Sequence, residues 1–306
     1  MPALPKALSS VLNPAFLRKL DRLRLTIRHS LSTRAGNTPM PRGSQGSGIE
    51  VESYLPYHPG DDLRHVDWNA YSRLGQLLVK RFRAEREAPL QIFVDSSASM
   101  GAPEGDDKLG FAQGLAASLA YVSLRHHDPV RIVSVSNALP DGFRSSPTFR
   151  HRQAVSQLRD FLACLQPRGA TALAGGVTAA LREQRTAGIA IVLSDFLTEP
   201  AAYETALAAL TARRFTVAAL RLIGPAERDP TRQFRRAEIV DAESGRRRLV
   251  TLTTENLARY ERALSQHLAT LSAFCSRCGV FFTTLDTSAG LEHSLFQSLP
   301  ATGMIH

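Results

Sequence analysis

The chain has 306 residues, of which 43% are hydrophobic and 21% charged, as in a globular protein with one large domain or two small ones. No apolar run approaches the roughly 20 residues that a membrane-spanning helix needs, and no long apolar signal segment opens the chain. We therefore expect a cytoplasmic protein. The net charge of +9 permits an anionic partner such as nucleic acid or a membrane surface. However, short basic runs such as Arg246–Arg248 lack interleaved aromatic residues, so a solvated surface is favoured and nucleic acid is not expected.

The first predicted element is an amphipathic helix that begins at Asn13-Pro14, with Asn as the cap and Pro in the first turn. Apolar residues such as Phe16 and Leu20 alternate with a strongly basic face. Docking of this helix on the domain is favoured, although peripheral contact with a membrane surface stays open. Residues 31–48 are rich in Ser, Gly and Pro, which predicts a linker.

The stretch from residue 49 to 88 contains the element Y-x-P-G-D-D-x-R-x-x-D-W, which ends at Trp68. Paired carboxylates beside a Gly can bind metal, as in polymerases, but that chemistry also needs a phosphate-binding cleft, and none is visible. A structural role is favoured: Asp61 or Asp62 caps a short helix, and Arg64 and Arg73 pair with Asp67 or Glu50. A strand is predicted over 77–82.

From residue 90 onward, apolar strands alternate with amphipathic helices, which predicts an α/β fold with a doubly wound, mostly parallel sheet. Two short strands near 237–252 flank a turn and predict a hairpin insertion. A long helix from Thr254 carries an apolar stripe from Leu257 to Phe274, which we expect to lie in the core. The expected domains are an N-terminal arm of helix, loop and short strands over 1–88 and the sheet domain over 89–306.

The buried strand Ile92–Val94 is followed by three oxygen-bearing side chains at alternate positions, Asp95, Ser97 and Ser99. Because ligands of doubly wound sheets bind at the carboxyl ends of the strands, these residues form a candidate site. Carboxylate and hydroxyl oxygens suit a hard cation, Mg²⁺ or Mn²⁺. The alternative is that all three are turn and cap residues.

Two later loops supply further oxygen-bearing side chains, first a Thr and then an Asp. Thr171 follows Gly169-Ala170, and Asp195 follows the apolar strand Ile189–Leu193. The D-x-S-x-S motif at Asp95, followed by this Thr and Asp, resembles the metal-ion-dependent adhesion site of von Willebrand factor A domains. The resemblance implies that the five side chains hold one ion and that an acidic side chain of a protein partner completes its coordination.

The wider pattern resembles the bacterial domain-of-unknown-function 58 family over roughly residues 48–290. The residues that carry this likeness are the G-D-D-x-R-x-x-D-W element, A-x-x-R-x-G-x-L-x-V-K after it, and D-x-S-x-S-M. The resemblance implies a von Willebrand A-like domain that acts as an adaptor or co-chaperone of a MoxR-type AAA+ ATPase. The chain departs from the family at Leu55, where an Arg is usual, and at Val51, where a Phe is usual.

The expected class is therefore a metal-dependent protein-interaction module and not an enzyme. Two alternatives remain open. One is a metal-dependent hydrolase, for which His58 or His65 would be the general base. The other is nucleic-acid binding through the basic surface, which would weaken steeply with salt. No G-x-x-x-x-G-K-[ST] nucleotide loop and no G-x-S-x-G elbow occur. The three cysteines, with Cys275 and Cys278 in a lone C-x-x-C, are expected to be ordinary thiols.

Overall fold

We analysed a computed structural model of the chain, which describes residues 5–11, 13–25, 51–82, 88–103, 105–183, 186–232 and 236–306. The chain divides into a large unit, Met1–Leu31 with Ala88–His306, and a small unit, Ser32–Glu87. This division differs from the expected single arm over 1–88, because the first helices belong to the large unit. The expected linker at 31–48 lies outside the described residues.

The large unit is built on one six-stranded sheet with the strand order β5-β4-β3-β6-β7-β10. All neighbouring strands are parallel except β4 and β5, which pair antiparallel at one edge. This order and direction confirm the expected doubly wound, von Willebrand A-like α/β fold. The strands are β3 (Leu90–Asp95), β4 (Val130–Val135), β5 (Phe143–Ser145), β6 (Ile189–Ser194), β7 (Thr216–Ile223) and β10 (Phe281–Asp286).

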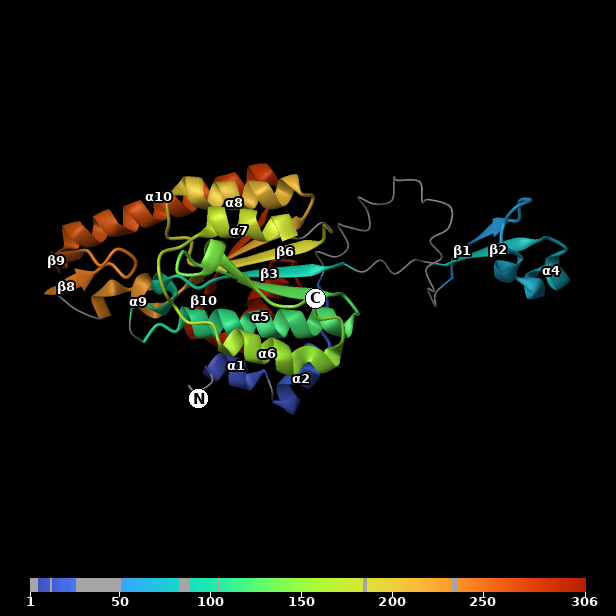
Figure 1. Ribbon diagram of the computed structural model, residues 1–306, viewed down its shortest axis with the longest axis horizontal. Coiled ribbons are helices and arrows are strands. Elements are labelled where there is room, and N and C mark those ends of the chain that lie inside the picture. Colours follow the sequence, from blue (N-terminus) through green and yellow to red (C-terminus); the bar gives the residue numbers. More distant parts are fainter. Residues whose placement is uncertain are drawn as a thin grey trace. The chain divides into compact units, whose positions relative to one another are not determined.

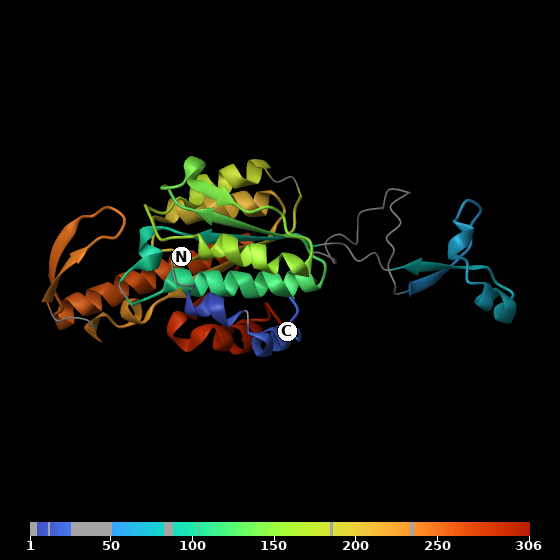
Figure 2. The same ribbon diagram turned by 60° about the horizontal axis from the view of Figure 1, so that its bottom comes forward.

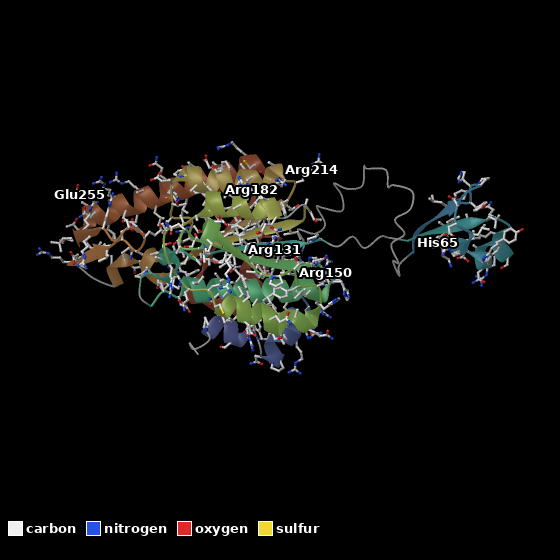
Figure 3. The ribbon with its side chains drawn as sticks, in the orientation of Figure 1. His65, Arg131, Arg150, Arg182, Arg214 and Glu255 are labelled. Atoms are coloured by element: carbon white, nitrogen blue, oxygen red, sulfur yellow. The ribbon has the colours of Figure 1, made fainter. Side chains whose placement is uncertain are left out.

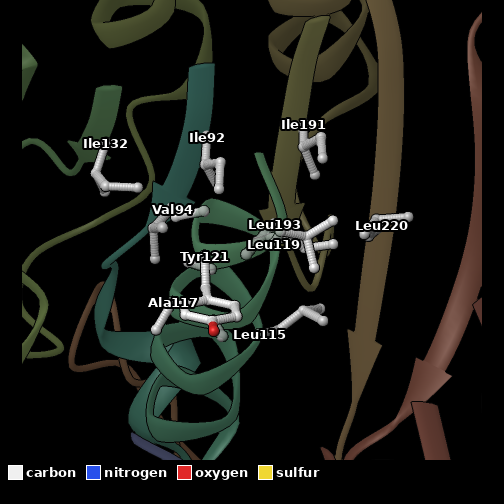
Figure 4. Packing of buried hydrophobic residues seen from close by; sticks show 14 of the residues in the cluster. Ile92, Val94, Leu115, Ala117, Leu119, Tyr121, Ile132, Ile191, Leu193 and Leu220 are labelled. Atoms are coloured by element: carbon white, nitrogen blue, oxygen red, sulfur yellow. The ribbon is translucent and has the colours of Figure 1, made fainter. Parts of the chain in front are cut away.

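Helices cover both faces of this sheet (Figure 1). Each face packs its own hydrophobic cluster, one against α5 and the other against α7, α8 and α10. Figure 4 shows the first cluster, in which Leu115 and Leu119 of α5 lie against Ile92, Val94 and Leu193 of the sheet. The helices are α5 (Lys108–Arg125), α6 (Val155–Ala163), α7 (Leu173–Glu183), α8 (Pro200–Ala212), α9 (Pro225–Arg228), α10 (Thr254–Cys278), α11 (Gly290–His293) and α12 (Leu299–Ala301).

The N-terminal helices α1 (Lys6–Ser10) and α2 (Pro14–Leu20) lie against the outer side of α5 (Figures 1 and 2). Asn13 caps α2 by accepting a hydrogen bond of 2.9 Å from the Ala15 amide, as expected. Phe16 and Leu20 are buried in the α5 cluster, so the expected docking of this helix on the domain is confirmed. None of the described helices combines the length and the apolar composition needed to cross a bilayer.

The C-terminal half of the large unit contains the expected hairpin, β8 (Arg236–Val240) with β9 (Arg247–Thr251). It leads into α10, whose apolar stripe is only partly core, contrary to our expectation. Leu271 is fully buried, whereas Tyr260 is 37% exposed. The first turns of α10 extend beyond the sheet (Figure 1), so they have no sheet face to cover.

The small unit contains a two-stranded antiparallel sheet and one helix, β1 (Val51–Pro56), β2 (Leu78–Phe82) and α4 (Trp68–Leu74). Asp62 caps a short 3-10 turn and pairs with Arg64 at 2.7 Å. Asp67 caps α4 and pairs with Lys80 at 3.2 Å. The acidic residues are therefore structural, as expected, but the partner of Asp67 is Lys80 and not an arginine.

Candidate metal centre

The candidate site lies where the buried strands β3 and β6 end side by side. The strands are parallel with Val94 opposite Leu193, so Asp95 and Ser194 are the next pair along. The Ser194 hydroxyl donates a hydrogen bond of 2.7 Å to Oδ2 of Asp95. The Thr171 hydroxyl, from the loop before α7, donates one of 3.1 Å to the same oxygen. Three segments of the chain thus meet at Asp95.

The loop after Asp95 folds back on its carboxylate. The Ser97 amide donates a hydrogen bond of 3.0 Å to Oδ1 of Asp95. The hydroxyl oxygens of Ser97 and Ser99 lie 3.0 Å apart, within hydrogen-bond distance. The amide of Ala98 donates to the carbonyl of Gly169 at 2.8 Å, which fixes this loop against the Thr171 loop. Alternate spacing in D-x-S-x-S therefore turns all three oxygen-bearing side chains towards one place.

Gly169 allows the Thr171 loop to approach the neighbouring loops closely. Gly169 has a φ of +70°, and a Cβ on it would lie 2.2 Å from Oδ1 of Asn137. Any side chain would push the loop away, since no real Cβ contact is so short. The same Asn137 oxygen accepts a hydrogen bond of 2.7 Å from the Ala170 amide.

Asp195 is held by contacts of a different kind. Its Oδ1 accepts a hydrogen bond of 3.1 Å from the Leu197 amide, and its Oδ2 accepts one of 3.0 Å from Nζ of Lys108. The next residue, Phe196, has a φ of +53°, a left-handed conformation that is costly for a bulky side chain. Its carbonyl accepts a hydrogen bond of 2.8 Å from Nε2 of His267 on α10, which holds the strained turn in place.

Lys108 places a cation inside the protein beside this site. Its side chain is fully buried and pairs with both Asp195 and Glu227. Burial lowers the pKa of its ammonium group, but the charges of Asp195 and Glu227 outweigh that effect, so the pKa is raised. The ammonium group therefore remains charged, and its single charge is shared between two carboxylates.

A second buried cation, Arg221 of β7, lies near the same carboxylates. It is 1% exposed, and its Nε and Nη2 atoms have no hydrogen-bond partner among the described residues. Burial lowers the pKa of its guanidinium group, while the charges of Glu227 and Asp195 act to raise it. Arg221 adds positive potential to the Lys108 side of the site without forming an ion pair.

Among the residues that the structure describes, no cation pairs with Asp95. Burial, followed by the charge of Asp195, raises the pKa of its carboxyl group to about 6. The Asp95 carboxylate and the hydroxyls of Ser97, Ser99 and Thr171 converge here, and the Asp195 carboxylate is near enough for its charge to act on Asp95. An all-oxygen donor set of this kind fits a hard divalent cation. The described residues contain no group of three or more His, Cys, Asp or Glu side chains that could hold a metal. The candidate site thus depends on the hydroxyls of Ser97, Ser99 and Thr171.

Three neighbours of the site were missed by the sequence analysis: Ser194, Lys108 and Glu227. Ser194 could have been found, because it ends the strand that pairs with β3. Lys108 lies 87 residues from Asp195 and 119 from Glu227 in the sequence, so no local pattern links them. The proposed bases, His58 and His65, belong to the small unit. Among the described residues, no histidine bonds to Asp95 or Asp195.

The raised pKa of Asp95 makes stability depend on pH. The folded state holds the proton more tightly than the unfolded chain, whose carboxyl pKa is 3.8. Without metal, the charged carboxylate therefore destabilises the fold above about pH 6, and this penalty fades as the pH falls towards 3.8. Asp95→Asn should raise the free energy of unfolding in EDTA by roughly 1–3 kcal/mol near pH 8.

Urea unfolding across this pH range measures the effect, with Asp160→Asn on the surface as a control. A benefit from Asp95→Asn that stays constant between pH 8 and pH 4 would contradict the assigned pKa shift.

Lys108→Met should destabilise the large unit, because it leaves Asp195 and Glu227 buried without their cation. The expected loss is about 3–5 kcal/mol, the usual cost of breaking a buried ion pair. Adding Glu227→Gln should recover part of it, since one of the two stranded charges is removed. Urea unfolding of the single and double variants measures both. Equal stability of Lys108→Met and wild type would show that the ammonium group does not stabilise this site.

Comparison with known proteins places the chain among uncharacterized relatives. It is 26% identical over 283 residues to the uncharacterized protein Rv1480 of Mycobacterium tuberculosis, a match that covers 90% of this chain and 86% of the relative. Among solved structures, it is similar to BatB from Bacteroides thetaiotaomicron, with 16% identity, a TM-score of 0.43, and coverage of 71% of this chain and 98% of that chain. A von Willebrand factor type A protein from Catenulispora acidiphila matches with 17% identity and a TM-score of 0.34, over 48% of this chain and 35% of that chain.

The family comparison covers most of the chain. Residues 53–270 match the family described as "Protein of unknown function DUF58". This range includes the G-D-D-x-R-x-x-D-W element and all five candidate metal ligands, and it agrees with the resemblance that those motifs indicate. The chain therefore belongs to the DUF58 family, with a von Willebrand A-like large unit.

Proposed function

We propose that this protein is a metal-dependent protein-interaction module, which acts as an adaptor or co-chaperone of a MoxR-type AAA+ ATPase. The observation that supports this most strongly is the convergence of the Asp95, Thr171 and Asp195 loops at one edge of the sheet. Within the described part of the chain, the buried Asp95 carboxylate pairs with no cation, whereas Asp195 pairs with Lys108.

In this proposal Asp95, Ser97, Ser99, Thr171 and Asp195 hold one Mg²⁺ or Mn²⁺ ion. When bound, the ion supplies a Lewis-acidic position that an acidic side chain of the partner completes. The protein orients the oxygens: Ser194 and the Ser97 amide hold the Asp95 carboxylate, and His267 holds the turn after Asp195. Lys108 fixes the Asp195 carboxylate from the buried side.

The choice of an AAA+ partner rests on the family, in which the resemblance implies an association with MoxR-type ATPases. An acidic partner also agrees with the net charge of +9. Nucleic acid is a weaker candidate. The arginines labelled in Figure 3 come from separate elements of the large unit, and one of them, Arg131, pairs with Glu183.

Metal binding is the first test. Isothermal titration of the full chain with Mg²⁺ or Mn²⁺ should give one site, because five oxygen ligands converge there. Asp95→Ala should abolish the binding, and Asp160→Ala on the surface of α6 should leave it intact. Equal binding by wild type and Asp95→Ala would refute the site.

The second test separates an adaptor from an enzyme. The double variant Ser97→Ala with Ser99→Ala should lose Mg²⁺-dependent capture of a purified MoxR-type ATPase, since these hydroxyls are ligands. The matched double variant Ser272→Ala with Ser276→Ala, on the exposed side of α10, should retain it. His65→Ala should also retain it, because a general base has no task in an adaptor.

A hydrolase would behave differently in a broad esterase, phosphatase and peptidase screen. Removal of its general base should lower turnover roughly 10²- to 10⁴-fold. Metal-dependent turnover that disappears in His65→Ala would overturn the adaptor proposal. Capture that survives both EDTA and the double Ser97/Ser99 variant would show that the interaction does not use the metal.

A further inference from the structure

The small unit exposes far more apolar side-chain surface than its size predicts. Six of the eleven large hydrophobic residues that are exposed among the described residues lie in it. Single exposed hydrophobics are ordinary, but six lie on this small unit, and two of them, Tyr54 and Leu74, line one groove. The six are Tyr54, Leu55, Leu63, Trp68, Tyr71 and Leu74, with exposed fractions between 45% and 64%. We refer to them as the aromatic surface.

The G-D-D-x-R-x-x-D-W element builds the scaffold under this surface. Asp62 caps the 3-10 turn that begins at Leu63, by accepting a hydrogen bond from the Arg64 amide. Asp67 accepts hydrogen bonds of 3.0 and 3.1 Å from the Asn69 and Ala70 amides, which starts α4 at Trp68. The carboxylates of the motif are thus occupied inside the unit. Trp68 follows them directly and yet is 59% exposed, so the scaffold holds it out towards solvent.

The aromatic surface borders a hollow. A groove of about 450 Å³ is lined by Tyr54, Ala70, Leu74 and Leu78, with Arg73 and Asp67 among its polar walls. On the same helix, Trp68 and Tyr71 contact each other edge to face, with ring centroids 6.3 Å apart. Aromatic side chains and arginine around an apolar groove are the residue types that dominate binding energy in protein interfaces.

The charges around the groove favour an acidic occupant. The negative charge of Asp67 is matched by Lys80 at 3.2 Å. Arg73 is exposed and has no carboxylate partner among the residues that the structure describes. Its guanidinium is therefore available to a carboxylate of a partner, while the groove floor receives an apolar side chain.

We propose that the aromatic surface is a docking site for an acidic protein segment that also carries apolar side chains, held by Arg73 and the groove beside it. This inference extends the proposed function, because it gives the same acidic partner a second contact. The metal site and the aromatic surface belong to separate compact units. Each contact can therefore be removed without the other.

The chain carries its own reporter, because Trp68 is its one tryptophan. The probe is a short synthetic peptide of alternating Glu and Leu residues, titrated into the full-length protein in EDTA. The expected result is a saturable blue shift of Trp68 emission with protection from acrylamide. Arg73→Glu should weaken binding at least tenfold, by reversing a charge contact worth about 1.4 kcal/mol or more. Leu74→Ala should weaken it as well and keeps the reporter.

Controls distinguish this inference from the proposed function. Asp95→Ala and EDTA should leave the Trp68 shift unchanged. A failure of the proposed metal site can therefore be distinguished from a failure of the aromatic surface to bind. Arg213→Glu makes the same charge reversal on the large unit and should have no effect. A peptide of alternating Lys and Leu should not bind.

Four outcomes would overturn the proposal. Emission from Trp68 that is already blue and protected in the free, dilute protein would show that the chain covers the surface itself. A shift that depends on protein concentration, with dimers in sedimentation, would assign the surface to a second copy. Equal binding of the Lys peptide or of phosphatidylcholine vesicles would exclude acidic recognition. No response to the Glu peptide would remove the site.

Discussion

The register of β3 against β6 is the constraint on which the candidate site depends. Because Val94 lies opposite Leu193, the two strands end at the same level and Asp95 comes beside Ser194. A shift of one residue would turn Asp95 to the other face of the sheet and lose the hydrogen bond from Ser194. The register is fixed by burial, since β3 and β6 are buried over their whole length. The apolar strands thus position the charged Asp95 at their carboxyl ends, whereas a charge in the middle of either strand would be destabilising.

The buried cation Lys108 makes the two carboxylates of the candidate site unequal. One ammonium charge is shared by Asp195 and Glu227, and Asp95 receives hydroxyl and amide donors only. A buried carboxylate without a cation has a raised pKa, as Asp95 has. The candidate site therefore divides into a half around Lys108, where one ammonium charge is shared by two carboxylates, and a half around Asp95, whose charge the proposed divalent ion would offset. This asymmetry also gives Asp195 a fixed orientation whether or not a metal is present.

Features that depend on residues near each other in the sequence could be predicted, whereas contacts between residues far apart in the sequence could not. The D-x-S-x-S spacing works because the Ser97 amide bonds back to Asp95, a contact between near neighbours. The alternation of strands and helices likewise predicted the sheet. The roles of Lys108 and Glu227 could not be predicted, since only the tertiary fold brings them to Asp195. The apolar stripe of α10 was overestimated for a related reason: periodicity shows that a helix has an apolar face, but not how much of that face is covered, and Tyr260 is 37% exposed.

In the proposed function, the two units would contribute differently to recognition. The proposed metal site offers polar oxygens, which would recognise charge and geometry. The small unit offers the reverse: Trp68, Tyr71 and Leu74 present apolar area, and Arg73 supplies a single charge. Polar complementarity gives specificity and apolar burial gives affinity, so neither unit alone has both. The carboxylates of the G-D-D-x-R-x-x-D-W element therefore matter to binding indirectly. They fold the short turns from which Trp68 projects, with 59% of its surface exposed.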